Sequence, residues 1–340
     1  MANIETSMRR PTGSVLITGA NGFVGRHLTQ RLISQNIPLK LVVREAARLP
    51  AAWRDNSNIT VVELGDLGAC ADSELAGALT GVDAVVHLAG ISASRGLDPQ
   101  EYQKQNAEMT DRLCLQAEKS GVSVFINMSS IFAVSGSTHA GIVSDETPAE
   151  PKTEYGRSKR AGELYVNKLA HKGMFAVSLR PPLVIAPDAG GNWKQLMRLA
   201  ASGIPLPFAS LDNRRTYCGI ETLVDAIMVL VLQNWPASKS GSYALAERGA
   251  VSLADTLRLL RSGMSVPRRL YYFPSFVFGL LSGMPGLGAR FQSLAGDCEI
   301  DARRFYETFE FEPENELADL IYQCGKEYAC RQRRETEGTT

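Results

Sequence analysis

A glycine-rich turn follows the first apolar run of this chain and limits the folds that the chain can adopt. The run Ser14–Thr18 leads directly into Gly19, Asn21, Gly22, Phe23, Val24 and Gly25. Glycines at such a turn let the backbone bend tightly, admit a pyrophosphate with no Cβ in the way, and let the next helix sit close to the strand. The helix N-terminus then offers free N–H groups to the phosphates. Because strand, turn and helix occur in this order, the segment predicts a dinucleotide site, whereas a glycine triplet alone would be typical of an ordinary turn.

Short apolar runs alternate with amphipathic stretches through the first half of the chain. Buried strands are predicted at Ser14–Thr18, Leu39–Val43, Ile59–Glu63, Ala84–Leu88, Val122–Met128 and Phe175–Leu179. Helix-like spacing is found at Gly22–Gln35, Ser73–Leu79, Asp98–Ser120 and Glu154–Lys172. This alternation indicates parallel strands joined by crossover helices, which is the doubly wound α/β fold called the Rossmann fold.

The length and a looser second half predict an added lobe. At roughly 150 residues per domain, a chain of 340 residues has room for about two units. We expect a dinucleotide-binding Rossmann domain over 13–180, with part of 216–245 packed on it, and a smaller C-terminal substrate-binding lobe, mainly 181–330. The tails 1–12 and 331–340 are expected to be disordered. In the lobe we expect helices at Asn192–Ser202, Thr222–Asn234, Ser252–Ser262 and Glu314–Tyr328, and strands near Ser242–Leu245 and Leu270–Phe273.

The charge balance excludes some partners. Lys plus Arg number 36 and Asp plus Glu number 36, so the chain has no global positive field for nucleic acid. The most apolar segment, Tyr271–Leu287, is interrupted by prolines and serines and falls short of the about 20 apolar residues of a membrane span. We expect it to be a buried cap over a substrate pocket. Six cysteines without a CxxC pair predict reduced thiols, a cytoplasmic location and no metal site.

The tip of the second predicted strand bears on which dinucleotide binds. An acid there hydrogen-bonds the 2′-hydroxyl of NAD, whereas an arginine neutralises the 2′-phosphate of NADP. Arg44 occupies this place, so NADP(H) is favoured. The neighbouring Glu45 keeps NAD(H) possible.

Residues after the third and fourth strands are predicted to complete the cofactor site. Asp66 can accept a hydrogen bond from the adenine amino group, although an Asp after a strand is also a common turn residue. The residues Leu67, Leu88, Ala89 and Gly90 are expected to line the path of the cofactor. His87, on a buried strand, is interpreted as a core histidine.

Tyr155 and Lys159 form a candidate catalytic pair. Their spacing of four places both on one face of a helix. A free tyrosine, with a pKa of about 10, is a poor acid–base group at neutral pH, and a nearby ammonium group with an oxidised nicotinamide would stabilise its phenolate. The fifth strand ends at Ser129 and Ser130, and the Ser130 hydroxyl can bind the substrate oxygen that Tyr155 protonates.

In this order and spacing, the motifs resemble the extended short-chain dehydrogenase/reductase family, the NAD(P)-dependent epimerase/dehydratase group that acts on nucleotide sugars. The resemblance covers roughly Ser14 to Tyr328. It implies that Ser130 is the catalytic serine beside Tyr155 and Lys159, and that Asn106 braces the active site. It also implies cofactor contacts by Ser129, Tyr155, Lys159, Pro182 and Val184, with Lys159 holding the cofactor ribose. It further implies substrate contacts by Ser130, Asn192 and Arg215, and a homodimer.

Three reactions share these groups in the family: 4-epimerisation, 4,6-dehydration and reduction of a 4-keto sugar. The family's dehydratases carry Thr-Asp-Glu at the serine site, whereas this chain has Ser130-Ile131-Phe132. With Arg44, the resemblance favours NAD(P)H-dependent reduction at C4 of a UDP-4-keto-6-deoxy-N-acetylhexosamine for surface polysaccharide precursors. A UDP-hexose or UDP-N-acetylhexosamine 4-epimerase with tightly bound NAD stays open, as does a non-catalytic NAD(P)-binding sensor.

Overall fold

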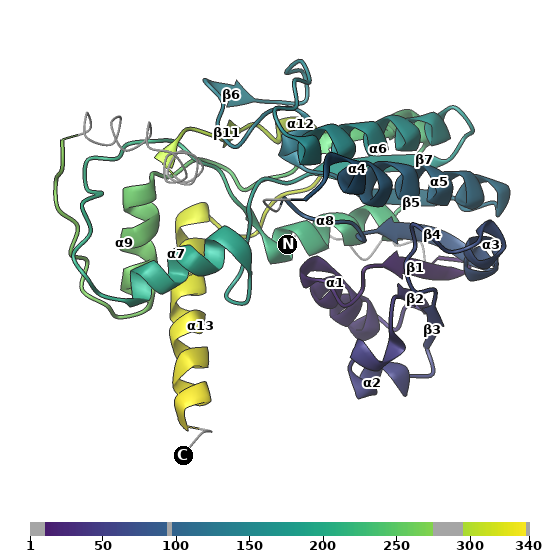
Figure 1. Cartoon of the computed structure of the whole chain (residues 1–340), viewed down its shortest axis with the longest axis horizontal. Coiled ribbons are helices and arrows are strands. Elements are labelled where there is room, and N and C mark those ends of the chain that lie inside the picture. Colours follow the sequence, from purple (N-terminus) through teal and green to yellow (C-terminus); the bar gives the residue numbers. More distant parts are fainter. Residues whose placement is uncertain (1–10, 94–96, 275–294, 338–340) are drawn as a thin grey trace.

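A seven-stranded parallel sheet lies in the right-hand part of the molecule in Figure 1. The computed structural model describes residues 11–93, 97–274 and 295–337. The strands follow the order β10-β7-β5-β4-β1-β2-β3. Their bounds are β1 Ser14–Thr18, β2 Leu39–Val43, β3 Ile59–Glu63, β4 Val82–His87, β5 Val124–Met128, β7 Phe175–Arg180 and β10 Gly241–Ala244. Because the order reverses where β1 lies between β4 and β2, the ligand crevice of such a sheet is expected at the carboxyl ends of these strands.

Helices cover both faces of the sheet. The helices of this part are α1 Phe23–Ser34, α2 Ala51–Arg54, α3 Asp72–Leu79, α4 Pro99–Tyr102, α5 Met109–Lys119, α6 Glu154–Ala170 and α8 Ile220–Leu232. Successive residues of β4 point to opposite faces, as strand geometry requires. Val86 belongs to the same core as Leu28 of α1 and Leu223 of α8, whereas Val85 packs in a second core with Leu79 of α3 and Leu113 of α5. The doubly wound α/β architecture predicted from the sequence is therefore confirmed.

A group of helices lies to one side of the sheet (Figure 1). Its helices are α7 Gly191–Ala201, α9 Leu253–Gly263 and α13 Leu317–Glu337. Helix α12 Arg303–Phe309 instead packs against β10 of the sheet. Two short strand pairs complete the structure, β6 Ile142–Val143 with β11 Glu299–Ile300, and β8 Val184–Ile185 with β9 Cys218–Gly219. Helix α13 packs against α9 and α7. In the described part of the chain, no helix is long and apolar enough to cross a membrane, and no cluster of side chains has the make-up of a metal site.

Four sequence predictions need correction. Leu270–Phe273 is not a strand, because only Leu270 forms a β-bridge, with Leu206. The prolines at 205 and 207 flank Leu206 and donate no N–H, so the pairing does not extend into a ladder. Tyr271 and Tyr272 are 57% and 75% exposed, so this start of the expected cap is not buried; residues 275–287 lie outside the described residues. The tail is helical to Glu337, because 326–337 holds good helix formers and no glycine or proline. Asp98–Ser120 is interrupted by a π-helical turn at Gln103–Glu108.

Candidate active site

The glycine turn is built to admit a phosphate group. Gly19 has a φ of +73°, a conformation that side chains rarely adopt. A Cβ on Gly25 would lie 2.2 Å from the carbonyl oxygen of Gly19, so the helix approaches the strand only because this residue is glycine. Gly22 caps α1 without a side chain, and no acidic residue lies in the first turn. The N–H groups of that turn are thus left for an anion, which is the arrangement that a dinucleotide pyrophosphate needs.

A buried hydrogen-bond chain fixes the ends of β1 and β4 behind this turn. The Thr18 hydroxyl lies 2.7 Å from Nδ1 of His87 and accepts from the N–H of Ala89 at 3.1 Å. On the other side, Nε2 of His87 lies 3.1 Å from the Thr110 hydroxyl, which donates to the carbonyl of Asn106 at 2.7 Å. Burial lowers the pKa of His87 to about 3, so its ring is neutral. His87 is 2% exposed, as expected for a core histidine rather than a catalyst.

The tip of β2 carries an arginine with no carboxylate paired to it in the described residues. Arg44 is exposed and follows β2 directly, whereas Glu45 forms an ion pair with Arg48 at 2.9 Å. Asp66, after β3, accepts from the N–H of Gly68 at 3.0 Å and from Gln105 at 3.3 Å. Burial raises the pKa of Asp66, but these hydrogen bonds and the charges of Arg44 and Lys104 outweigh it, so the pKa is lowered. Asp66 is therefore an acceptor at neutral pH.

Tyr155, Lys159 and Ser130 meet between the end of β5 and the first two turns of α6. Thr153 caps α6, since its hydroxyl accepts from the N–H of Gly156 at 3.0 Å, and this fixes Tyr155 in the first turn. Tyr155 forms a hydrogen bond with Ser130. The Lys159 ammonium donates to the carbonyl of Met128 at 2.8 Å. The three predicted catalytic groups are thus held in one place by two elements.

Aromatic neighbours enclose the Tyr155 ring. Tyr102 and Phe132 both meet it edge to face, with centroids at 6.0 Å and 5.8 Å. Burial raises the pKa of the Tyr155 phenol, the Ser130 hydrogen bond lowers it, and Tyr102 raises it further, with a net increase. The phenol is therefore protonated at neutral pH unless a positive charge is added nearby.

Asn106 braces the site through the loop after β4. It lies in the π-helical turn Gln103–Glu108. Its Oδ1 accepts from the N–H of Ile91 at 2.9 Å, and its Nδ2 donates to the carbonyl of Ile91 and to the Ser158 hydroxyl, both at 3.1 Å. Asn106 thus joins this loop to α6, one residue away from Lys159. A π-turn is frequent at functional sites, and the sequence did not predict it.

The predicted substrate residues lie outside this cluster. Asn192 is exposed in the first turn of α7. The Arg215 guanidinium donates to the carbonyl of Gly296 at 2.7 Å and to that of Ser137 at 3.2 Å. It thereby ties the loop after Ser130 to the segment before β11. Arg214 is instead exposed and paired with Glu299.

Ser129, a predicted cofactor contact, leads to Glu163, a group that was not predicted from the sequence. The Ser129 hydroxyl is buried and donates to Glu163 Oε1 at 2.7 Å. Glu163 is 0% exposed and is bound by Arg180 of β7. A signal existed, because Tyr155, Lys159 and Glu163 repeat at intervals of four along one face of α6.

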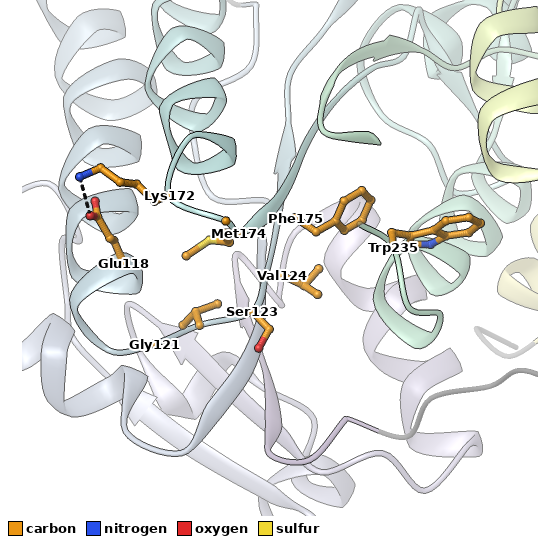
Figure 2. Close-up of a pocket in the computed structure, with 10 residues that line it drawn as sticks. Glu118, Gly121, Ser123, Val124, Lys172, Met174, Phe175 and Trp235 are labelled. Carbon is orange, nitrogen blue, oxygen red and sulfur yellow. Dashed lines mark ion pairs between the residues drawn. The ribbon is translucent and has the colours of Figure 1, made fainter. Parts of the chain in front are cut away.

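A separate cavity of about 380 Å³ lies at the opposite edge of the sheet (Figure 2). Its lining includes Val124 and Phe175 at the amino ends of β5 and β7 and Trp235 after α8, with the ion pair of Lys172 and Glu118 at one side. The catalytic groups lie at the carboxyl end of β5. This cavity is therefore not part of the candidate active site.

Comparison with known proteins shows the family. The profile of the NAD dependent epimerase/dehydratase family matches residues 15–246. A UDP-glucose 4-epimerase of Vibrio cholerae is 30% identical over 333 residues, which cover 95% of this chain and 98% of that protein. The chain therefore belongs to the NAD dependent epimerase/dehydratase family, and it is an oxidoreductase or epimerase that uses a nicotinamide dinucleotide.

Solved structures show the same fold. The complex of MoeE5 with UDP-glucose and NAD superposes with a TM-score of 0.72 at 21% identity, covering 94% of this chain and 100% of that one. The UDP-N-acetylglucosamine 4-epimerase of Bacillus cereus gives a TM-score of 0.71 at 16% identity, covering 93% and 99%. At these identities the likeness establishes the fold.

The buried lysine predicts a pH dependence of cofactor binding. Burial lowers the pKa of Lys159 to about 8, against the opposing charge of Glu163. Lys159 is therefore cationic below that pH and neutral above it. We expect NADPH affinity, measured by the fluorescence of the bound dihydronicotinamide from pH 7 to 9.5, to weaken as pH rises through about 8. The range starts above the second phosphate pKa of about 6, so the 2′-phosphate does not titrate in it.

The matched control for this titration is Lys159→Met. This variant lacks the titrating ammonium, so its affinity is expected to be weak and nearly independent of pH. A wild-type profile that stays flat through pH 9.5 would show that Lys159 does not contact the cofactor in its charged form.

Proposed function

We propose that this enzyme uses NADPH to reduce the C4 keto group of a UDP-linked 4-keto-6-deoxy-N-acetylhexosamine, a precursor of surface polysaccharide. The observation that carries the choice of reductase is the charge at the tip of β2. Arg44 is exposed there with no ion-pair partner among the described residues, and Glu45 is held by Arg48. A guanidinium in this position favours a 2′-phosphate, and NADPH is the usual cellular reductant.

The catalytic groups suit proton donation to a ketone. When bound, the cofactor supplies a hydride, which forms the new C–H bond at C4 of the sugar. Tyr155 transfers its phenolic proton to the C4 oxygen and is then reprotonated from solvent. Ser130 hydrogen-bonds the same oxygen, and Lys159 holds the cofactor ribose and stabilises the phenolate that proton transfer leaves.

The protonation state of Tyr155 also supports the direction of reaction. Reduction needs a neutral phenol beside a reduced, uncharged nicotinamide, and burial raises the pKa of Tyr155 towards that state. Oxidation of an alcohol, the first half of an epimerase reaction, needs the phenolate. In an epimerase, the positive charge of an oxidised nicotinamide would have to lower the pKa of Tyr155 enough to form this phenolate.

A 4-epimerase with tightly bound NAD is the second candidate. It is supported by the Vibrio cholerae UDP-glucose 4-epimerase, which this chain matches over nearly its whole length. The same three catalytic groups serve both reactions. A non-catalytic sensor is the weaker interpretation, because it has no need of Ser130, Tyr155 and Lys159 held together.

The substrate contacts and the oligomer are proposals too. We propose that Asn192 and Arg215 contact the nucleoside diphosphate; Arg215 is half-buried beside the loop that follows Ser130.

We also propose a homodimer, supported by Leu115 and Leu164, which are 47% and 50% exposed on the neighbouring helices α5 and α6. Sedimentation equilibrium measures this directly, and a monomer at micromolar concentration would contradict it.

Replacing Arg44 with serine tests the cofactor assignment. A charge-assisted hydrogen bond contributes about 1.5–3 kcal/mol, so the ratio of kcat/KM for NADPH to that for NADH is expected to fall about 10- to 100-fold. The exposed Arg54 of α2 offers a matched control. Arg54→Ser removes the same charge from the connection between β2 and β3 and is expected to leave the ratio unchanged. An unchanged ratio in Arg44→Ser would contradict the proposal.

A further inference from the structure

Glu163 is a fully buried carboxylate one helical turn beyond Lys159. It is 0% exposed, and Arg180 of β7 binds it with two hydrogen bonds of 2.7 Å, from Nε to Oε1 and from Nη2 to Oε2. Arg160 of α6 donates to Oε2 at 2.9 Å, and the Ser129 hydroxyl donates to Oε1 at 2.7 Å. The four hydrogen bonds thus come from three parts of the site: β7, α6 and the turn after β5.

Two of these contacts bear on the residues that carry the chemistry. Ser129 precedes Ser130, and Met128, whose carbonyl accepts from Lys159, precedes Ser129. The turn 128–130 is therefore hydrogen-bonded to α6 at two points: Lys159 bonds to the backbone carbonyl of Met128, and Glu163 bonds to the Ser129 hydroxyl. Ser130 belongs to the same turn.

The surrounding charges form a buried network. Arg180 also faces Asp145 at 3.7 Å, and Arg304 faces Asp145 at 3.5 Å. Asp145 accepts from the N–H of Ala244 at 2.7 Å, and burial raises its pKa to about 6. The charged groups around Glu163 are thus Lys159 and Arg160 of α6, Arg180 of β7 and, beyond it, Asp145 and Arg304.

Stability alone does not account for such a group. Buried ion pairs lose much of their attraction to desolvation, and apolar residues of similar size often stabilise a core equally well. Glu163 lies where a carboxylate has two effects that an apolar residue lacks: it accepts from Ser129, and it places negative charge on the face of α6 that carries Lys159.

We propose that Glu163 is a positioning residue of the hydride-transfer reaction, which fixes the turn 128–130 through Ser129 and keeps Lys159 in its cationic form. This rests on the proposed roles of Ser130, Tyr155 and Lys159, and it holds for reductase and epimerase alike. Glu163 itself touches neither substrate nor cofactor.

The test compares Glu163→Gln with Ser129→Ala in the full-length enzyme. Glutamine keeps an acceptor for Ser129 but removes the charge that raises the pKa of Lys159. The pH above which NADPH affinity declines is therefore expected to fall by about 0.5–1 unit, with kcat reduced about tenfold at pH 8. Ser129→Ala keeps the charge, so kcat is expected to fall severalfold with the pH profile unmoved. Glu118→Gln, which breaks an exposed ion pair with Lys172, is the control and should change neither.

The double variant Glu163→Gln/Arg180→Gln guards against a folding failure, because it leaves no lone charge of that pair in the core, and Arg304 still faces Asp145 at 3.5 Å. It is expected to show the same shift of the affinity profile. The proposal is overturned if Glu163→Gln or the double variant folds and keeps the wild-type kcat and the wild-type pH profile of NADPH affinity. A lower melting temperature as the sole effect would likewise show that Glu163 is only structural. Because NADPH affinity needs no sugar, an enzyme that fails to reduce any 4-keto sugar would overturn the proposed function and leave this result standing.

Discussion

Tyr155→Phe is expected to lower kcat by about 10²- to 10⁴-fold, the range typical of a lost general acid. The phenyl ring keeps its edge-to-face contacts with Tyr102 and Phe132. The loss is therefore that of the proton donor and its hydrogen bond with Ser130, and NADPH affinity should stay within about twofold. The measurement is the steady-state oxidation of NADPH by a UDP-4-keto sugar, followed at the nicotinamide absorbance.

Tyr165→Phe is the matched control on the same helix. Tyr165 lies more than two turns further along α6, where the ammonium of Lys168 is 4.9 Å from its ring centre. Its hydroxyl has no part in the proposed site, so turnover should be unchanged. Near-normal turnover by Tyr155→Phe would exclude Tyr155 as the acid.

The second large effect is expected from Gly25→Ala in the phosphate-binding turn. The added methyl would lie 2.2 Å from the carbonyl oxygen of Gly19 and 2.8 Å from Cα of Ala20, and both are backbone atoms that do not move aside cheaply. Helix α1 must therefore shift away from β1, which misdirects the N–H groups meant for the pyrophosphate. We expect NADPH affinity to fall more than about 100-fold, since misplaced donors lose charge-assisted hydrogen bonds, together with a lower melting temperature.

Gly77→Ala separates this effect from a general cost of substituting glycine. Gly77 lies in α3, and a Cβ there meets no atom within 4 Å. Alanine is the better helix former, so this variant is expected to be as stable as the wild type or slightly more stable, with unchanged NADPH affinity. Retention of NADPH affinity by Gly25→Ala would place the cofactor elsewhere.

The sheet and the phosphate turn could be predicted from the sequence because their signals are local. Continuous apolar runs such as Ser14–Thr18 and Phe175–Leu179 are required of strands buried on both faces. The spacing of four residues that places Tyr155 and Lys159 on one face of a helix is equally local. The serine, tyrosine and lysine thus lie together as the spacing predicts.

The remaining features depend on contacts between distant segments. The π-turn at Asn106 has no local pattern, and its side chain finds Ile91 and Ser158 only after β4 and α6 are in place. The burial of Glu163 depends on its ion pair with Arg180, which comes from β7 and reaches Glu163 only in the folded core. The contacts of Arg215 with the carbonyls of Ser137 and Gly296 likewise join segments that lie 78 and 81 residues apart in the sequence.

The fate of deuterium carried at C4 of the nicotinamide distinguishes reduction of the sugar from its epimerisation. NADPH dideuterated at this carbon is incubated with the enzyme and a UDP-4-keto-6-deoxy-N-acetylhexosamine, and the sugar is examined by mass spectrometry. A reductase gives one deuterium at C4 of each product molecule and one NADP⁺ per product. The contrary result is no net oxidation of NADPH, with a UDP-hexose or UDP-N-acetylhexosamine converted to its C4 epimer by NAD that stays bound to the protein.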